Sequence, residues 1–152
     1  MTIHGIDISP TAIDIANYFR SRLKQEVKDR IHFTATDIKS FYPGFKFDSC
    51  MMTDVLEHLP LETAKDIVVD LKRLLVDDAP IFISLPFEKN YFDPTHCNFF
   101  YSLEEFDVFC KALGLKVNFS RVDEKWHAID AVVSICKNEE PFVLNCPLET
   151  AQ

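Results

Sequence analysis

Apolar residues recur along this chain in two patterns that alternate. Short, nearly continuous apolar runs predict strands at residues 3–8, 31–35, 47–53, 80–85, 115–122 and 128–136. Apolar positions at helical spacing predict helices from Pro10 to about Val27, over Ala64–Leu75 and from Ser102 to Gly114. This alternation, closed by two successive strands, predicts an α/β fold. We expect a three-layer sheet of about six strands, mostly parallel, with an antiparallel edge.

Helix-start signals and the absence of linkers define the domain. Ser9 before Pro10 predicts an N-cap and a first helical position, and Ser102 with Glu105 forms a capping box. No repeat, low-complexity tract or linker interrupts residues 1–137, so we expect one domain there. Residues 138–152 contain two prolines and predict a loosely held C-terminal tail.

Charge and cysteine content narrow the functional classes. The chain has 16 Lys and Arg against 24 Asp and Glu, a formal net charge of −8. An acidic surplus disfavours nucleic acids and anionic membranes as partners, because both need a basic surface. No apolar run approaches the roughly 20 residues of a membrane span, and no leader pattern is present. The five cysteines are scattered and odd in number. We therefore expect a reduced, cytoplasmic protein.

Acidic residues follow the first three predicted strands. Three glycines are too few for a Gly-rich phosphate loop, which excludes nucleotide binding of that kind within the chain. Ligands of parallel sheets bind beyond the carboxyl ends of the strands, where Asp7, Asp37 and Asp54 stand, with Glu57 and His58 close behind. Carboxylates accept hydrogen bonds from ribose hydroxyls and an exocyclic amine, but they repel phosphate. The pattern favours a nucleoside ligand.

Several consecutive motifs resemble one enzyme family. GIDISPTAIDIA (5–16), FDSCMMTDVLEHLP (47–60) and DPTHCNFFYSLEEFDVFCKALGL (93–115) resemble, in the correct order, segments of class I S-adenosylmethionine-dependent methyltransferases. The resemblance runs from about Ile3 to Lys137. It implies a Rossmann-like methyltransferase sheet, S-adenosylmethionine as cofactor and S-adenosylhomocysteine as product.

The resemblance also assigns roles to individual residues. It implies that Asp7, with Ile8 beside it, binds the cofactor ribose, and that Asp37 contacts the adenine amine with Ile38 beside the ring. Thr53, Asp54 and His58 would line the cleft for cofactor and substrate.

His96 is a second histidine candidate, in the aromatic loop at residues 86–101. We interpret it as a base that removes a proton from the acceptor, with His58 near the substrate. A metal site could be imagined from His58, Asp93, His96 and Cys97, but no compact ligand spacing supports it, so none is expected.

The chain departs from the family at its start. The family's first strand and Gly-rich turn wrap the methionine part of the cofactor, and no such segment precedes Ile3. We therefore expect an N-terminally incomplete sheet. A truncated chain, a rearranged sheet that pairs strands 3–8 and 47–53, and a partner chain that fills the gap all stay open; a homodimer is one form of the last.

Two functional hypotheses follow. The first is methyl transfer from S-adenosylmethionine to an O, N or C nucleophile of a small-molecule acceptor. The second is a non-catalytic remnant of the fold that serves as a binding or assembly subunit. The retained acidic positions favour the first, and the missing Gly-rich turn favours the second. A Rossmann-type dehydrogenase is disfavoured because it needs the glycine turn as well.

Overall fold

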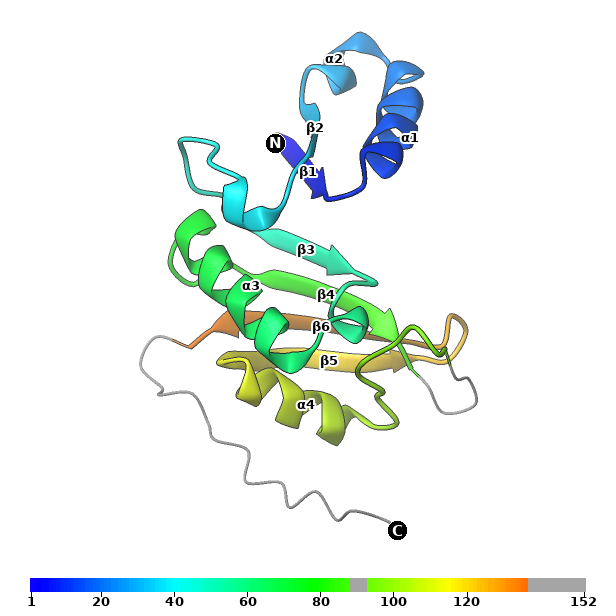
Figure 1. The fold of residues 1–152 in the computed structure, drawn as a ribbon, viewed down its shortest axis with the longest axis vertical. Helices are drawn as coiled ribbons and strands as arrows, with labels where there is room; N and C mark the ends of the chain where they lie inside the picture. Colours follow the sequence, from blue (N-terminus) through cyan, green and yellow to red (C-terminus); the bar gives the residue numbers. More distant parts are fainter. Residues whose placement is uncertain (88–92, 137–152) are drawn as a thin grey trace. The chain divides into compact units, whose positions relative to one another are not determined.

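The structure, a computed structural model, describes residues 1–87 and 93–136. The predicted tail and the loop aromatics Tyr91 and Phe92 therefore lie outside the described residues. The elements in chain order are β1 (Ile3–Asp7), α1 (Pro10–Ser21), α2 (Gln25–Lys28), β2 (Ile31–Ala35), η1 (Ile38–Ser40), β3 (Cys50–Thr53), η2 (Leu56–His58), α3 (Leu61–Leu74), β4 (Ile81–Pro86), α4 (Leu103–Ala112), β5 (Leu115–Asp123) and β6 (Ala128–Ile135) (Figure 1). The chain divides into two compact units, Met1–Gly44 and Phe45 onward.

The first unit is a parallel strand pair with helices on the connection between the strands. β1 pairs with β2 in register from Ile3 opposite Ile31 to Asp7 opposite Ala35. Ser9 caps α1 as predicted: its side chain accepts a hydrogen bond from the Ala12 amide at 3.2 Å. Parallel strands need a crossover connection, and here it contains α1 and α2, so this unit is a single β-α-β crossover.

The single helix predicted from Pro10 to about Val27 is wrong. α1 ends at Ser21, and α2 begins only at Gln25. Lys24 has extended backbone angles, φ −62° and ψ 148°, and therefore interrupts the helical path. Residues 22–24 contain neither Gly nor Pro, and the helical spacing of apolar residues continues across them. The sequence therefore contains no sign of this break.

The second unit is a four-stranded sheet in the order β3-β4-β6-β5. β3 and β4 are parallel, and β6 is antiparallel to both of its neighbours. α3 and α4 cover the same face of this sheet (Figure 1). On β4, buried side chains alternate with partly exposed ones, so one face of the strand points to the helices and the other does not.

The core of the second unit lies between this sheet and the two helices. Its fully or nearly fully buried apolar side chains include Val68, Leu71 and Leu74 of α3, Phe106 and Cys110 of α4, Ile81, Ile83 and Leu85 of β4, and Ile129, Ala131 and Val133 of β6. Ser102 caps α4 as predicted, because its hydroxyl accepts from the Glu105 amide at 3.2 Å; the Glu105 carboxylate accepts from the Tyr101 amide at 2.8 Å and not from Ser102, as a complete capping box would require. Gly114, with φ 72°, ends the helix in the left-handed conformation that glycine adopts most easily.

The α/β class and the mixed strand directions are confirmed, but the sheet differs from the predicted one. The six strands fall into a two-stranded and a four-stranded sheet instead of one, because no described strand hydrogen-bonds to both β1 and β3. The antiparallel strand β6 lies next to the edge strand β5, which agrees with an antiparallel strand at or near one edge. Within the described residues, no helix is both long and apolar enough to cross a bilayer.

Candidate functional site

Two predicted carboxylates lie at the same edge of the first unit. Asp7 is the last residue of β1, and its register partner on β2 is Ala35. Asp37 follows Ala35 by two residues, and the Thr36 amide donates to the Asp7 carbonyl oxygen at 2.9 Å. Both carboxylates therefore stand at the carboxyl ends of adjacent parallel strands, where ligands of such sheets bind.

Each of these carboxylates is oriented by the backbone that follows it. Asp7 Oδ1 accepts a hydrogen bond from the Ser9 amide at 2.7 Å, and Asp37 Oδ1 accepts from the Lys39 amide at 2.9 Å. Both residues are exposed. The turn amide binds one oxygen of each carboxylate, so the other oxygen can accept hydrogen bonds from a ligand. Hydroxyl and amine groups can donate these hydrogen bonds, and a nucleoside carries both.

Apolar neighbours accompany both carboxylates in the first unit. Ile8 is 79% exposed directly after Asp7, and Ile38 is the first residue of η1 directly after Asp37. An apolar side chain next to a hydrogen-bonding carboxylate is compatible with contact to a ribose or an aromatic base.

The other predicted positions belong to the second unit. Thr53 ends β3, and Asp54 follows with a positive φ of 52°. The Asp54 amide donates to the Ser84 carbonyl oxygen of β4 at 3.0 Å, which continues the strand pairing by one residue. A non-glycine residue in this left-handed region is uncommon and marks a sharp change of chain direction at the strand end.

The turn η2, which follows Asp54, is hydrogen-bonded to residues 97 and 98, which are distant from it in the sequence. The Cys97 and Asn98 amides donate to the Glu57 carbonyl oxygen at 2.6 and 3.0 Å. The Asn98 side-chain amide donates to the carbonyl oxygens of Leu56 at 2.8 Å and Leu59 at 2.7 Å. These four bonds hold the segment around His96 against the turn that carries His58.

The structure thereby brings the two predicted histidines together. Their rings meet edge to face, with centroids 4.7 Å apart and an interplanar angle of 77°. His58 Nδ1 lies 3.3 Å from the Thr95 carbonyl oxygen, and His58 Nε2 lies 3.9 Å from Glu57 Oε1. His58 is exposed and His96 is half-buried, so solvent or a small ligand can reach the pair.

Glu57 is the residue of this cluster that the sequence did not single out as a site residue. Only 1% of it is exposed, and both of its carboxylate oxygens lack a hydrogen-bond partner among the described residues. Burial raises the pKa of Glu57 above its ordinary value. Unpaired buried carboxylates are rare in folded proteins and often belong to functional sites. In the sequence, Glu57 is marked only by its position next to His58. The sequence does not show that Glu57 is buried.

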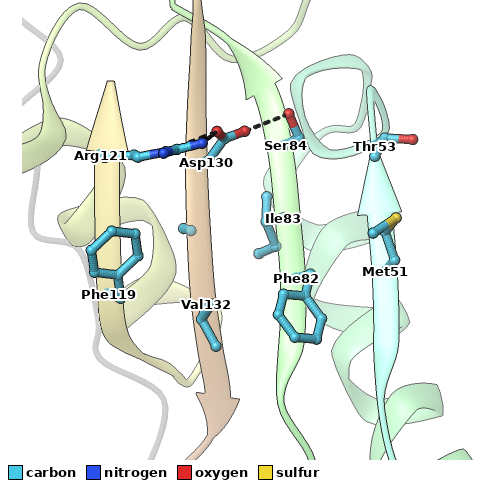
Figure 2. A pocket seen from close by; sticks show the side chains of 10 residues that line it. Met51, Thr53, Phe82, Ile83, Ser84, Phe119, Arg121, Asp130 and Val132 are labelled. Carbon is cyan, nitrogen blue, oxygen red and sulfur yellow. Dashed lines mark hydrogen bonds and ion pairs between the residues drawn. The ribbon is translucent and has the colours of Figure 1, made fainter. Parts of the chain in front are cut away.

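Polar side chains also form a row across the face of the sheet away from α3 and α4 (Figure 2). Thr53, Ser84, Asp130 and Arg121 are successive register partners on the four strands. The Ser84 hydroxyl donates to Asp130 Oδ1 at 3.0 Å, and Arg121 donates to Asp130 Oδ2 at 2.9 and 3.2 Å. This row stands over a hollow of about 240 Å³.

An apolar row lies beside the polar one on the same face. Met51, Phe82, Val132 and Phe119 are likewise register partners across the sheet (Figure 2). Met51 is 72% exposed within this unit. The two rows follow from the alternation of side chains along each strand, and they place Thr53 on a sheet face instead of in the loop cluster around His58.

Comparison with known proteins agrees with this geometry. A family model described as a methyltransferase domain matches residues 1–81. No curated protein sequence matches the chain.

Solved structures show the same fold at low sequence identity. A glycopeptide N-methyltransferase crystallised with S-adenosylmethionine has a TM-score of 0.69 at 8% identity, over 87% of this chain and 76% of that one. The N-methyltransferase NodS from Bradyrhizobium japonicum scores 0.61 at 15% identity, over 90% and 74%. The magnesium protoporphyrin IX methyltransferase from Synechocystis, crystallised with S-adenosylmethionine, scores 0.62 at 15% identity over 88% of this chain; the alignment spans only 59% of that enzyme.

The family match covers more than half of the 152 residues and includes β1 with Asp7, the turn at Asp37 and the whole segment from β3 to α3. The structural neighbours share the Rossmann-like methyltransferase fold. The chain therefore belongs to the methyltransferase domain family.

Proposed function

We propose that this chain binds S-adenosylmethionine and transfers its methyl group to a nucleophilic O, N or C atom of a small-molecule acceptor. The observation that carries the proposal is the pair of exposed carboxylates, Asp7 and Asp37, at the ends of adjacent parallel strands inside the family match. Solved neighbours crystallised with S-adenosylmethionine or S-adenosylhomocysteine support the choice of cofactor.

In this proposal the first unit holds the nucleoside part of the cofactor. Asp7 accepts hydrogen bonds from the ribose hydroxyls, with Ile8 packed beside the sugar. Asp37 accepts from the exocyclic amine of adenine, and Ile38 contacts the ring. The turn amides that already bind one oxygen of each carboxylate fix its orientation, which lowers the entropy lost on binding.

Thr53 and Asp54 are the candidate cofactor contacts within the second unit. Thr53 ends β3, and the positive φ of Asp54 fixes the direction in which the chain leaves the strand.

The acceptor side of the site is assigned to His58 and His96. The cofactor supplies a methyl group already activated by a sulfonium, so the protein has to align the nucleophile, exclude water and accept a proton when the nucleophile carries one. A neutral imidazole within reach of solvent can accept that proton near neutral pH. The edge-to-face contact and the tethered loop keep the two rings in place for this task.

The proposal is tested by calorimetric titration of the purified chain with S-adenosylhomocysteine. The wild type is expected to bind one equivalent, and Asp7→Ala is expected to weaken binding by about 1.5–3 kcal/mol, or roughly 10- to 150-fold, because a hydrogen bond to a charged acceptor is lost. Asp14→Ala is the matched control, since Asp14 is an exposed carboxylate on α1 in the same unit. Unchanged affinity in Asp7→Ala removes Asp7 from the site. No binding by the wild type favours the non-catalytic alternative.

A further inference from the structure

The cluster of Glu57, His58 and His96 has a chemistry that methyl transfer alone does not require. One ligand atom from each of these residues lies within 4.8 Å of the other two, and no other group of three His, Cys, Asp or Glu residues does so in the described part of the chain. We propose that this cluster is a binding site for a divalent transition-metal ion, with Zn²⁺ as the reference ion. This inference goes beyond the proposed methyl transfer and does not depend on it.

The first argument is the state of Glu57. Its two carboxylate oxygens are buried and have no hydrogen-bond partner within residues 1–87 and 93–136. An anion in that position is costly unless a cation or a donor compensates it. His58 Nε2 lies 3.9 Å from Glu57 Oε1, which is too far for a hydrogen bond.

The second argument is the orientation of His58. When its Nδ1–H donates to the Thr95 carbonyl oxygen at 3.3 Å, the ring lone pair is on Nε2, on the side of Glu57. A neutral nitrogen lone pair then faces a carboxylate oxygen, and neither can donate to the other. A metal ion between them binds both. A backbone carbonyl that accepts from the second ring nitrogen is the usual support of a metal-bound histidine.

The third argument is the way in which His96 is held. The Cys97 and Asn98 amides bind the carbonyl oxygen of Glu57, and the Thr95 carbonyl oxygen faces His58. The loop is therefore attached to the other two residues of the cluster on both sides of His96. A metal–ligand bond to nitrogen or oxygen is about 2.1 Å long, so three ligands of one ion stand somewhat closer together than they do here. We expect ion binding to draw the side chains of the exposed His58 and the half-buried His96 together by a small rotation.

The donor set selects the class of ion. Two imidazoles and one carboxylate suit Zn²⁺ and its first-row neighbours, whereas Mg²⁺ and Ca²⁺ prefer oxygen ligands. Three protein ligands leave a fourth position open, as in catalytic zinc sites. An acceptor hydroxyl bound there would lose its proton more easily, so the ion would replace the histidines as the group that activates it. Only this last step rests on the proposed methyl transfer.

The experiment is a calorimetric titration of the tag-free, metal-stripped full chain with Zn²⁺ in the presence of a weak competing chelator. We expect one ion per chain. His96→Ala and Glu57→Gln are each expected to weaken binding at least tenfold, the lower end of the effect seen when the surroundings of a metal are altered. Bound Co²⁺ should give visible d–d absorption in the wild type, and this absorption should be absent in His96→Ala.

Two controls separate this site from ordinary surface binding. His32→Ala alters the His4–His32 pair, whose rings are also 4.7 Å apart but which is not part of a three-ligand group among the described residues. Cys97→Ser alters the exposed thiol that lies next to the cluster. Both variants should bind Zn²⁺ like the wild type. Absence of binding by the wild type, or binding that survives His96→Ala and Glu57→Gln, would overturn the proposal. Since no cofactor is present in this titration, its failure leaves the proposed methyl transfer untouched.

Discussion

His58 and His96 come from separate segments of the chain, yet their rings are in edge-to-face contact with centroids 4.7 Å apart. The contact exists because the segment that carries His96 is hydrogen-bonded to η2 through Glu57, Leu56 and Leu59. One end of β3 and one distant loop thus form a single cluster with a buried carboxylate at its base.

Asn98 is predicted to hold this cluster together. Its side-chain amide binds two carbonyl oxygens of the η2 region, so Asn98→Ala removes both bonds at once. We expect the free energy of unfolding to fall by about 1–3 kcal/mol, because two hydrogen bonds are lost and their acceptors remain. Urea denaturation measures the change. The control is Asn118→Ala, whose exposed side chain makes one hydrogen bond, to Ser134. Equal stability of the two variants would contradict this role for Asn98.

Asp37 is predicted to recognise the exocyclic amine of adenine. Asp37→Ala should weaken binding of S-adenosylhomocysteine several-fold, since a charge-assisted hydrogen bond is lost. The inosine analogue, in which a carbonyl replaces the amine, should bind wild type and Asp37→Ala equally weakly. Calorimetric titration of the wild type and of Asp37→Ala with S-adenosylhomocysteine and with the inosine analogue gives the four affinities that this comparison needs. If the variant loses the same factor for both ligands, Asp37 acts elsewhere.

The cysteines are predicted to differ sharply in reactivity. Burial raises the pKa of Cys110 to about 12, with a further contribution from Asp107, and burial raises the pKa of Cys50 to about 11. The thiolate is the reactive form, so Cys110 should stay unmodified by iodoacetamide even at about pH 9 in the folded protein. Among the four cysteines that the structure describes, Cys97 is the exposed one and should react first. Mass spectrometry of timed samples checks the order. Alkylation of Cys110 at the rate of Cys97 without unfolding would contradict the described core.

Self-association is a further prediction, from the edge of the larger sheet. Among the described strands, β3 has a hydrogen-bonded neighbour on one side only, and Met51 on it is 72% exposed. Unpaired strand edges recruit other strands unless charge protects them. Sedimentation should therefore show a homodimer at micromolar concentration, and Met51→Lys should shift it toward monomer. Val69→Lys, on the exposed side of α3, is the control. A wild-type monomer would contradict this prediction.

The sequence predicted most elements because their signals are local. Ser9 with Pro10 and Ser102 with Glu105 marked helix starts that the structure reproduces. The alternation of buried and exposed residues on β4 arises because successive side chains point to opposite faces of the sheet and α3 and α4 cover one of these faces (Figure 1). The break between α1 and α2 was missed because Arg22, Leu23 and Lys24 carry no turn signal.

The site was predictable only in part, for a physical reason. Asp7 and Asp37 could be grouped because parallel strands end at one edge. Glu57 could not be recognised, since its burial depends on the packing of η2 and of the loop that follows β4. The contact of His58 with His96 depends on the same loop bonds and has no short-range spacing in the sequence.

This chain is proposed to bind its cofactor through the carboxyl ends of β1 and β2 in the first unit. The most direct measurement is a two-dimensional ¹H–¹⁵N spectrum of the labelled chain during titration with S-adenosylhomocysteine. We predict saturable shifts concentrated at the amides of Asp7–Ile8 and Asp37–Ile38, while α4, whose residues lie outside these strand ends, stays unchanged. Spectra without shifts at saturating ligand, or shifts confined to α4 and β5, would contradict it.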